Sequence, residues 1–275
     1  MKIDAHQHFW QYNPEEFGWI NEEMTVIKRD LLPEDLKPEL DAAGYDGCVA
    51  VQAPQTEAET EFLLGLADQH DFIRGVVGWV NLQAADVEAR LAHYSRHLKL
   101  VGLRHIAQAE PDDQFLLNPD FGRGIGLLKK YNLRYDILIY PRHLPVASQF
   151  AARFPDQPFV LDHLAKPFIK DHEMEPWATH LRGLARHENV YCKLSGMVTE
   201  ADWLVWDWDD FTPYLDVALE AFGPGRLMIG SDWPVCKVAA GYGEAMQIVE
   251  EYIARLSPSE KAGILGENAV RFYGL

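Results

Sequence analysis

Two histidines and one aspartate stand at the ends of apolar runs near the two ends of the chain. His6 and His8 are separated by one residue at the end of the first run. Side chains alternate faces along a strand, so both imidazoles share one face and can converge on one point. Asp232 follows another apolar run, 227–229, far later in the sequence. If the first and last strands of a closed barrel lie side by side, the three side chains meet at one rim. That combination suits hydrolytic chemistry, with or without a metal ion.

Eight short aliphatic or β-branched runs alternate with stretches of helical periodicity. Most of the runs are almost continuously apolar, which is typical of parallel strands buried on both faces. The pattern predicts a (β/α)₈ barrel that forms one domain over residues 1–275. An open doubly wound sheet is the alternative, but no glycine-rich phosphate turn is present. The predicted strands are 2–8, 47–52, 75–80, 100–105, 133–139, 159–163, 190–194 and 227–230.

The predicted helices leave two long segments outside regular structure. Residues 9–30 follow the first strand, and residues 197–210 follow the seventh; both are expected to be enlarged loops at the barrel mouth. The second contains Trp203, Trp206 and Trp208, which suit a lid or a subunit contact. The predicted helices are 33–43, 57–70, 84–97, 119–131, 145–154, 173–187, 211–222 and 243–255, with a short one from residue 259.

Composition excludes several classes of partner. The formal net charge of −17 argues against nucleic acid and anionic membranes. No apolar run approaches the roughly 20 residues of a membrane span, and the Met1 end has no signal-peptide pattern. Three widely spaced cysteines without a CxxC pair favour reduced, buried thiols and a cytoplasmic location.

Ionisable and aromatic residues gather at the predicted C-terminal strand ends, where barrel enzymes place their active sites. Of the adjacent pair Arg104 and His105, only one is expected to face the site, because neighbours on a strand point to opposite faces. In strand order the candidates are His6 and His8, Gln52, Trp79 and Asn81, Arg104 and His105, Tyr140 and Arg142, His163 and Lys166, Lys193 and Ser195, and Asp232.

Several of these segments resemble a known family. Residues 4–10 (DAHQHFW), 161–167 (LDHLAKP) and 230–234 (GSDWP) resemble motifs of the amidohydrolase superfamily. The segment 268–273 (NAVRFY) is similar to the closing motif of its metal-dependent-hydrolase branch. Residues 102–105 (GLRH) and 193–197 (KLSGM) resemble the sugar-lactone hydrolases of the L-fuconolactonase and L-rhamnonolactonase type.

The resemblance implies that His6, His8, His163 and Asp232 form the catalytic set. The same four residues would be the ligands if a divalent metal, zinc first, is bound. No lysine follows the fourth or fifth run to bridge two ions, so at most one ion is expected, and metal-independent catalysis stays equally open.

The resemblance also implies hydrolysis of a sugar lactone to its aldonic acid, with Asp232 activating the attacking water. The substrate is then a small neutral molecule, and the protein is a monomer or homodimer. Aromatic rings and hydrogen-bonding groups suit a polyhydroxylated ring. The expected substrate-binding residues are Trp10, Gln52, Trp79, Arg104, His105, Tyr140, Arg142 and Trp233.

Three alternatives remain. One is a metal-dependent non-oxidative decarboxylase of the same superfamily, which is disfavoured because no second histidine stands at a strand end after His163. Another is a hydrolase of a carboxylated lactone, for which Arg104, Arg142 and Lys166 could supply cations. The third is a non-catalytic binding barrel, which does not explain the crowded ionisable rim.

Overall fold

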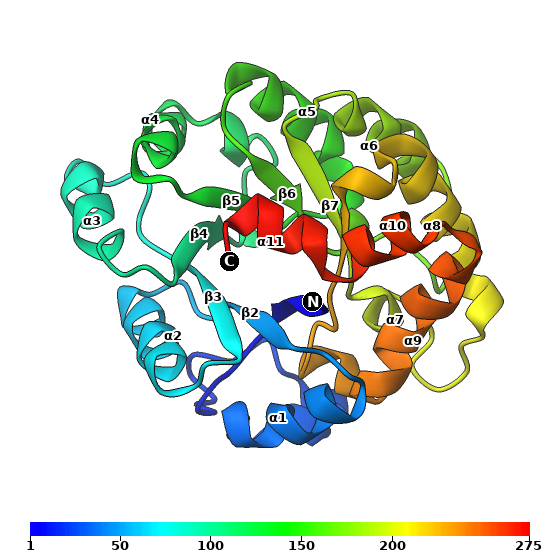
Figure 1. The fold of residues 1–275 in the computed structure, drawn as a ribbon. Coiled ribbons are helices and arrows are strands. Elements are labelled where there is room, and N and C mark those ends of the chain that lie inside the picture. The colour runs from blue at the N-terminus through cyan, green and yellow to red at the C-terminus, as the bar shows by residue number, and fades with distance from the viewer.

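A computed structural model describes all residues 1–275 and shows eight strands arranged around a barrel with helices outside them (Figure 1). Each strand pairs in parallel with the next along the chain. This confirms the predicted (β/α)₈ barrel. The strands are β1 (Ile3–Gln7), β2 (Gly47–Val51), β3 (Ile73–Gly78), β4 (Leu100–His105), β5 (Arg134–Ile137), β6 (Phe159–Leu161), β7 (Val190–Leu194) and β8 (Leu227–Ile229).

The barrel closes between the end of β1 with the residue after it and the residues that follow β8. The backbone N–H of His8 donates to the carbonyl of Trp233 at 2.7 Å, and that of Asp232 donates to the carbonyl of His6 at 2.8 Å. An isolated parallel bridge pairs Gln7 with Trp233. The first and last strands are therefore joined at the level of the histidines and Asp232.

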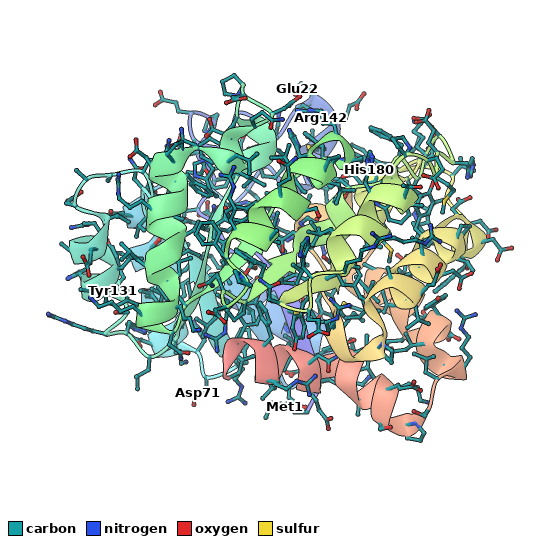
Figure 2. All side chains as sticks on the ribbon, turned by 90° about the horizontal axis from the view of Figure 1, so that it is seen from above. Met1, Glu22, Asp71, Tyr131, Arg142 and His180 are labelled. Atoms are coloured by element: carbon teal, nitrogen blue, oxygen red, sulfur yellow. The ribbon has the colours of Figure 1, made fainter.

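Helices cover the outside of the barrel, and α11 lies across its N-terminal opening (Figure 1). Met1 lies at the same end of the molecule as α11, whereas Glu22 and Arg142 lie at the opposite end (Figure 2). The helices are α1 (Pro33–Ala42), α2 (Glu57–Gln69), α3 (Val87–Tyr94), α4 (Pro119–Leu128), α5 (Leu144–Arg153), α6 (Trp177–Ala185), α7 (Met197–Glu200), α8 (Trp208–Phe222), α9 (Tyr242–Tyr252), α10 (Pro258–Ala262) and α11 (Asn268–Tyr273).

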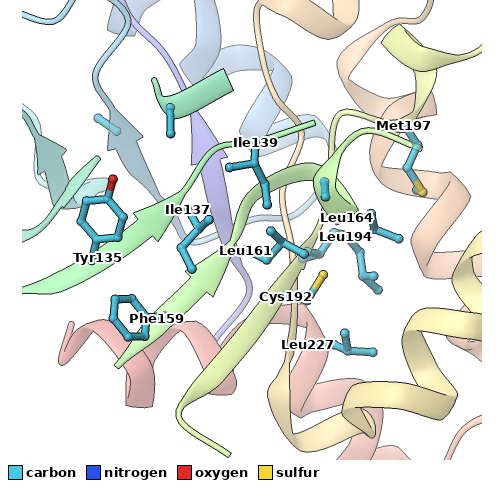
Figure 3. Close-up of a cluster of buried hydrophobic side chains, with 14 of the residues drawn as sticks. Tyr135, Ile137, Ile139, Phe159, Leu161, Leu164, Cys192, Leu194, Met197 and Leu227 are labelled. Carbon is cyan, nitrogen blue, oxygen red and sulfur yellow. The ribbon is translucent and has the colours of Figure 1, made fainter. Parts of the chain in front are cut away.

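Alternation along the strands divides the apolar core into two layers. In β6, Phe159 and Leu161 pack in the large outer cluster between strands and helices, part of which is seen in Figure 3. Val160 points inward and packs with Met228 and with Ala269 of α11. Burial on both faces explains the continuous apolar runs in the sequence. The polar groups that follow the strands therefore lie at the C-terminal end of the barrel, above an apolar interior.

The segment after β7 is more structured than predicted. It contains the short helix α7, and α8 begins at Trp208 rather than at residue 211. Asp207 caps α8, because its side chain accepts from the N–H of Asp209 while Asp210 accepts from the N–H of Asp207. This reciprocal cap starts the helix one turn earlier than hydrophobic periodicity indicates.

No helix is long and apolar enough to cross a membrane. All three cysteines are buried and unpaired.

Glu59 in α2 is a buried acid outside the site, and it should make stability depend on pH. Burial raises its pKa to about 7, although it accepts a hydrogen bond from the N–H of Ala53 at 3.0 Å. The folded state binds this proton more tightly than the unfolded chain, so stability is lost as pH rises from about 4.5 to about 7.

We expect Glu59→Gln to remove up to about 3 kcal/mol of this pH-dependent loss in the free energy of unfolding. Glutamine keeps an oxygen that accepts from Ala53 but carries no charge. Urea unfolding of both proteins between pH 4.5 and pH 8 measures the difference, and the other buried acids cancel in the comparison. If the free energy of unfolding changed with pH in the same way in both proteins, the raised pKa of Glu59 would be contradicted.

Candidate active site

Four buried side chains converge at the C-terminal ends of β1, β6 and β8. The Nε2 atoms of His6 and His8 lie 3.2 Å apart. The Oδ1 atom of Asp232 lies 3.4 Å from His8 Nε2, 3.8 Å from His163 Nε2 and 3.9 Å from His6 Nε2. The chain thus brings together the set that the resemblance implied, and one carboxylate oxygen faces three imidazoles.

The orientation of His8 is fixed by a backbone carbonyl. Its Nδ1 lies 2.7 Å from the carbonyl oxygen of Val51, which can only accept a hydrogen bond. Nδ1 therefore carries the proton, and in the neutral ring the lone pair of Nε2 faces Asp232. Burial lowers the pKa of His8, which favours this neutral form.

His163 reaches the site through an unusual backbone path. β6 ends at Leu161, two residues before the predicted end, because residues 163–166 all adopt left-handed conformations with φ between 52° and 60°. The ring Nδ1 of His163 lies 2.9 Å from the hydroxyl of Ser195. Next to it, Gly196 has a φ of 62°, and a Cβ there would lie 2.5 Å from the same Nδ1. Only glycine fits this approach.

Asp232 is positioned by a second aspartate from β1. Asp4 accepts hydrogen bonds from the N–H of Ser231 at 2.9 Å and from its hydroxyl at 2.6 Å. The Ser231 hydroxyl in turn accepts from the N–H of Trp233 at 2.9 Å. These bonds hold Asp232 in a left-handed conformation, with φ of 58°. Asp4 was not predicted, although it begins the motif that contains both histidines.

The site keeps Asp232 ionised. Burial alone raises the pKa of this carboxyl, but attraction to the protonated forms of His163 and His8 outweighs burial and lowers the pKa overall. Burial holds the pKa values of His6 and His163 well below the usual range. A neutral imidazole cluster with one anionic carboxylate is the resulting state near pH 7.

A buried charge network lies beneath His6. Lys193 Nζ lies 2.5 Å from Asp136 Oδ2, 3.0 Å from Asp162 Oδ1 and 3.1 Å from His6 Nδ1. Tyr273 of α11 donates its hydroxyl to Asp136 at 2.8 Å. Lys193 was placed at the rim by the sequence, but its side chain is fully buried inside the barrel, as are both aspartates.

Arg104 joins this network to the site. Its Nη1 lies 3.1 Å from Asp162 Oδ2 and 3.3 Å from His6 Nε2, and its Nη2 donates to the carbonyl of Gln52. A guanidinium and an ammonium only donate, and Lys193 Nζ lies 3.1 Å from His6 Nδ1, so each ring nitrogen of His6 faces a cationic donor. Asp162 Oδ1 also lies 3.3 Å from His6 Nδ1. Burial, together with these two cations, lowers the pKa of His6.

A cavity of about 530 Å³ opens above Asp232. His8, His163, Asp232 and Arg104 line one part of it. A polar side consists of Gln108, Tyr140, Lys166 and Glu200. The apolar part includes Trp19, Met24, Ile106, Leu138, Trp203 and Val235.

Of the eight predicted substrate-binding residues, Arg104 and Tyr140 line the cavity. Gln52 lies behind Arg104, where its amide donates to the Arg104 carbonyl at 3.2 Å. Trp79 donates to His105 at 3.2 Å, and His105 contacts Glu110 at 2.7 Å, so these rings bind each other beside the cavity.

The remaining three predicted substrate-binding residues do not line the cavity. Trp10 is fully buried and donates to the carbonyl of Arg29, and Trp233 is fully buried against Phe9. Arg142 is exposed and paired with Asp113 at 2.9 Å, outside the cavity.

Some cavity residues had no signal in the sequence. Glu200 and Gln108 were not singled out, and Trp203 was assigned to a segment that suits a lid or a subunit contact. They belong to irregular or short helical segments after β7 and β4, whose paths are not encoded by strand periodicity. Their only shared signal is that they lie in segments that follow the C-terminal end of a strand.

The donor set can accommodate one metal ion. His6 Nε2, His8 Nε2 and Asp232 Oδ1 lie 3.2 to 3.9 Å from one another. Ligand atoms of a tetrahedral zinc site, with bonds of about 2.0–2.2 Å, lie about 3.3–3.5 Å apart. The lone pair of His8 Nε2 already points at this position. The Nη1 of Arg104 approaches the same nitrogen of His6, so an ion here would have to displace it.

A family model described as an amidohydrolase matches residues 3–275. The chain belongs to the amidohydrolase family. An L-fucono-1,5-lactonase of Burkholderia multivorans is 42% identical over 100% of this chain and 96% of its own length. An L-fucono-1,5-lactonase of Burkholderia ambifaria is 38% identical over 99% and 95%.

A solved amidohydrolase from Burkholderia multivorans with bound zinc is also similar to this amidohydrolase. It is 43% identical, covers 100% of this chain and 99% of its own, and superposes with a TM-score of 0.97.

Proposed function

We propose that this amidohydrolase hydrolyses a neutral sugar lactone to its aldonic acid, with L-fucono-1,5-lactone as the first substrate to test. The observation that carries the proposal is one buried carboxylate, Asp232, whose Oδ1 atom lies 3.4 to 3.9 Å from the Nε2 atoms of three histidines beside the cavity. Full-length similarity to two proteins named L-fucono-1,5-lactonase supports the same reaction.

Asp232 acts as the general base. It takes a proton from a water molecule, whose oxygen forms a bond to the lactone carbonyl carbon. The negative charge that develops on the carbonyl oxygen is stabilised by donors in the cavity. When the Ser195 hydroxyl donates to His163 Nδ1, the His163 Nε2–H faces the site, and Arg104 supplies further positive charge.

The tetrahedral intermediate collapses with cleavage of the bond to the ring oxygen. Protonated Asp232 returns its proton to that oxygen, which becomes a hydroxyl of the open acid. In its neutral tautomer, His8 presents the lone pair of Nε2 toward the site, so it accepts a hydrogen bond from the attacking water rather than donating to the carbonyl oxygen.

One divalent ion, zinc first, fits His6, His8 and Asp232, with His163 nearby. Such an ion would polarise the carbonyl and lower the pKa of water. The steps above use only groups of the chain. A small-molecule partner, a monomer or homodimer, and a cytoplasmic location belong to the same proposal; the three buried free cysteines support the last of these.

The direct test is an assay of the chelator-treated protein on a panel of neutral aldonolactones, with acid release followed by a pH indicator. We expect hydrolysis well above the uncatalysed rate for one stereochemical group. Turnover that returns only with added zinc would assign the step to a metal site. No turnover of any lactone, with or without zinc, would refute the proposed function and favour a decarboxylase.

A further inference from the structure

The polar side of the cavity has no role in the bond-breaking steps. Lys166 Nζ and Glu200 Oε1 both face the cavity and lie 3.9 Å apart. That distance is too long for a direct hydrogen bond. Neither charged group has a hydrogen-bond partner in the protein, while about a fifth of each side chain remains exposed. An ammonium and a carboxylate are thus held apart, each with unused hydrogen-bonding capacity.

A hydroxyl group fits between the Lys166 ammonium and the Glu200 carboxylate. Its oxygen can accept from an ammonium while its hydrogen is donated to a carboxylate. With hydrogen bonds of about 2.8 Å on each side, one oxygen can touch two atoms that lie 3.9 Å apart. Tyr140 adds an aromatic face to the same wall, because Lys166 Nζ lies 5.7 Å from the centre of its ring.

The backbone sets this pair relative to the reacting groups. Lys166 ends the left-handed segment that starts at His163, and its N–H donates to the His163 carbonyl at 2.7 Å. Glu200 ends α7, and its carbonyl accepts from the N–H of Lys170 at 2.9 Å. The loops after β6 and β7 are therefore tied together, and the pair is anchored to the segment that presents His163.

The charges on this side disfavour a carboxylated substrate. Arg104 is occupied by Asp162, and Arg142 pairs with Asp113 outside the cavity. The remaining cation, Lys166, is faced by Glu200. A substrate carboxylate would therefore meet a second carboxylate rather than a cluster of cations.

We propose that Lys166 and Glu200 form a hydroxyl-binding subsite that selects neutral polyhydroxylated lactones over unsubstituted and carboxylated ones. This inference rests on the proposed function. The subsite holds a ring or side-chain hydroxyl, orients the carbonyl toward Asp232, and repels a substrate carboxylate.

The test compares kcat/KM for a hydroxylated aldonolactone with kcat/KM for δ-valerolactone, which has no hydroxyl. We expect Glu200→Gln and Lys166→Met each to lower this ratio by about tenfold or more, since hydrogen bonds to charged groups contribute strongly to binding. Both groups contact one hydroxyl, so the double variant should lose less than the product of the single losses. Asp202→Asn is the control, because Asp202 is in the same segment, is paired with Lys170 and does not line the cavity.

The outcomes separate this inference from the proposed function. A wild-type protein that hydrolyses no lactone overturns both. An active wild-type protein whose ratio is the same in Glu200→Gln as in Asp202→Asn overturns the subsite alone. A Glu200→Gln variant that gains on neutral lactones also overturns it, whereas a gain on a dicarboxylate lactone together with a loss on neutral lactones supports it. A series of monodeoxy lactones then identifies the hydroxyl, because the analogue that lacks it should respond to neither substitution.

Discussion

Asp232→Asn is expected to lower kcat for lactone hydrolysis by about 10²-fold or more, with little change in KM. The amide is isosteric with the carboxylate but accepts no proton from water. Asp232 is also the one anion that faces His6, His8 and His163, so no neighbouring group can replace it. Steady-state rates across pH 6–9 measure the loss.

The control for this substitution is Asp156→Asn, which makes the same chemical change at an exposed residue near the opposite end of the barrel. It should leave kcat unchanged. Circular dichroism and thermal midpoints check that the Asp232 variant is folded. Turnover near the wild-type rate in folded Asp232→Asn would refute its role as general base.

Lys193→Met is expected to destabilise the protein by about 3–5 kcal/mol, because removing one partner leaves buried charges uncompensated. The side chains of Lys193, Asp136 and Asp162 are fully buried, and the lysine contacts both carboxylates. Burial already raises the pKa of Asp136 to about 6, whereas the lysine and Arg104 keep the pKa of Asp162 low. Without the lysine, both carboxylates should titrate at higher pH.

The sign of the pH dependence follows from these pKa values. A carboxyl whose folded pKa is raised destabilises the fold as pH rises from its unfolded pKa through the folded one. The Lys193→Met deficit in the free energy of unfolding should thus be largest at neutral pH and shrink toward pH 5. Urea unfolding measures it, and Lys193→Met with Asp136→Asn should recover part of the loss. A deficit independent of pH would show that packing rather than charge is responsible.

Local pattern predicted the barrel and the group at its rim. The spacing of His6 and His8 places both on one face of β1, whatever surrounds them. Burial on both faces makes parallel strands continuously apolar, so the apolar runs predicted these strands. Closure of the barrel then placed Asp232 beside the two histidines. His163 was placed at the end of a predicted strand, but a left-handed turn without a periodic signal presents it, and its role came from the family resemblance.

The support beneath the rim was not predictable in this way. Asp136 and Lys193 lie on β5 and β7, Asp162 directly follows β6, and Tyr273 reaches this network from the last helix. Each looks like an isolated polar residue within an apolar run. Their pairing is decided by strand register and by the placement of α11, neither of which is a local property.

The positions of the loop residues that line the cavity were also not predictable from local sequence. Trp10 and Trp233 stand next to the catalytic motifs in the chain but turn into the core, whereas Trp19 and Glu200 reach the cavity from farther along. Proximity in sequence predicts proximity to the site only while the chain is a strand, because alternation fixes where each side chain points. Beyond the strand end, turns and packing set the direction.

The sequence by itself determined the strands, their parallel order around a barrel and the residue types available at its mouth, since these follow from burial and periodicity. The tertiary structure decided the tautomer of His8, the buried ion network and the paired Lys166 and Glu200. Those features depend on distances between residues that are remote in the chain, and only the closed barrel sets such distances.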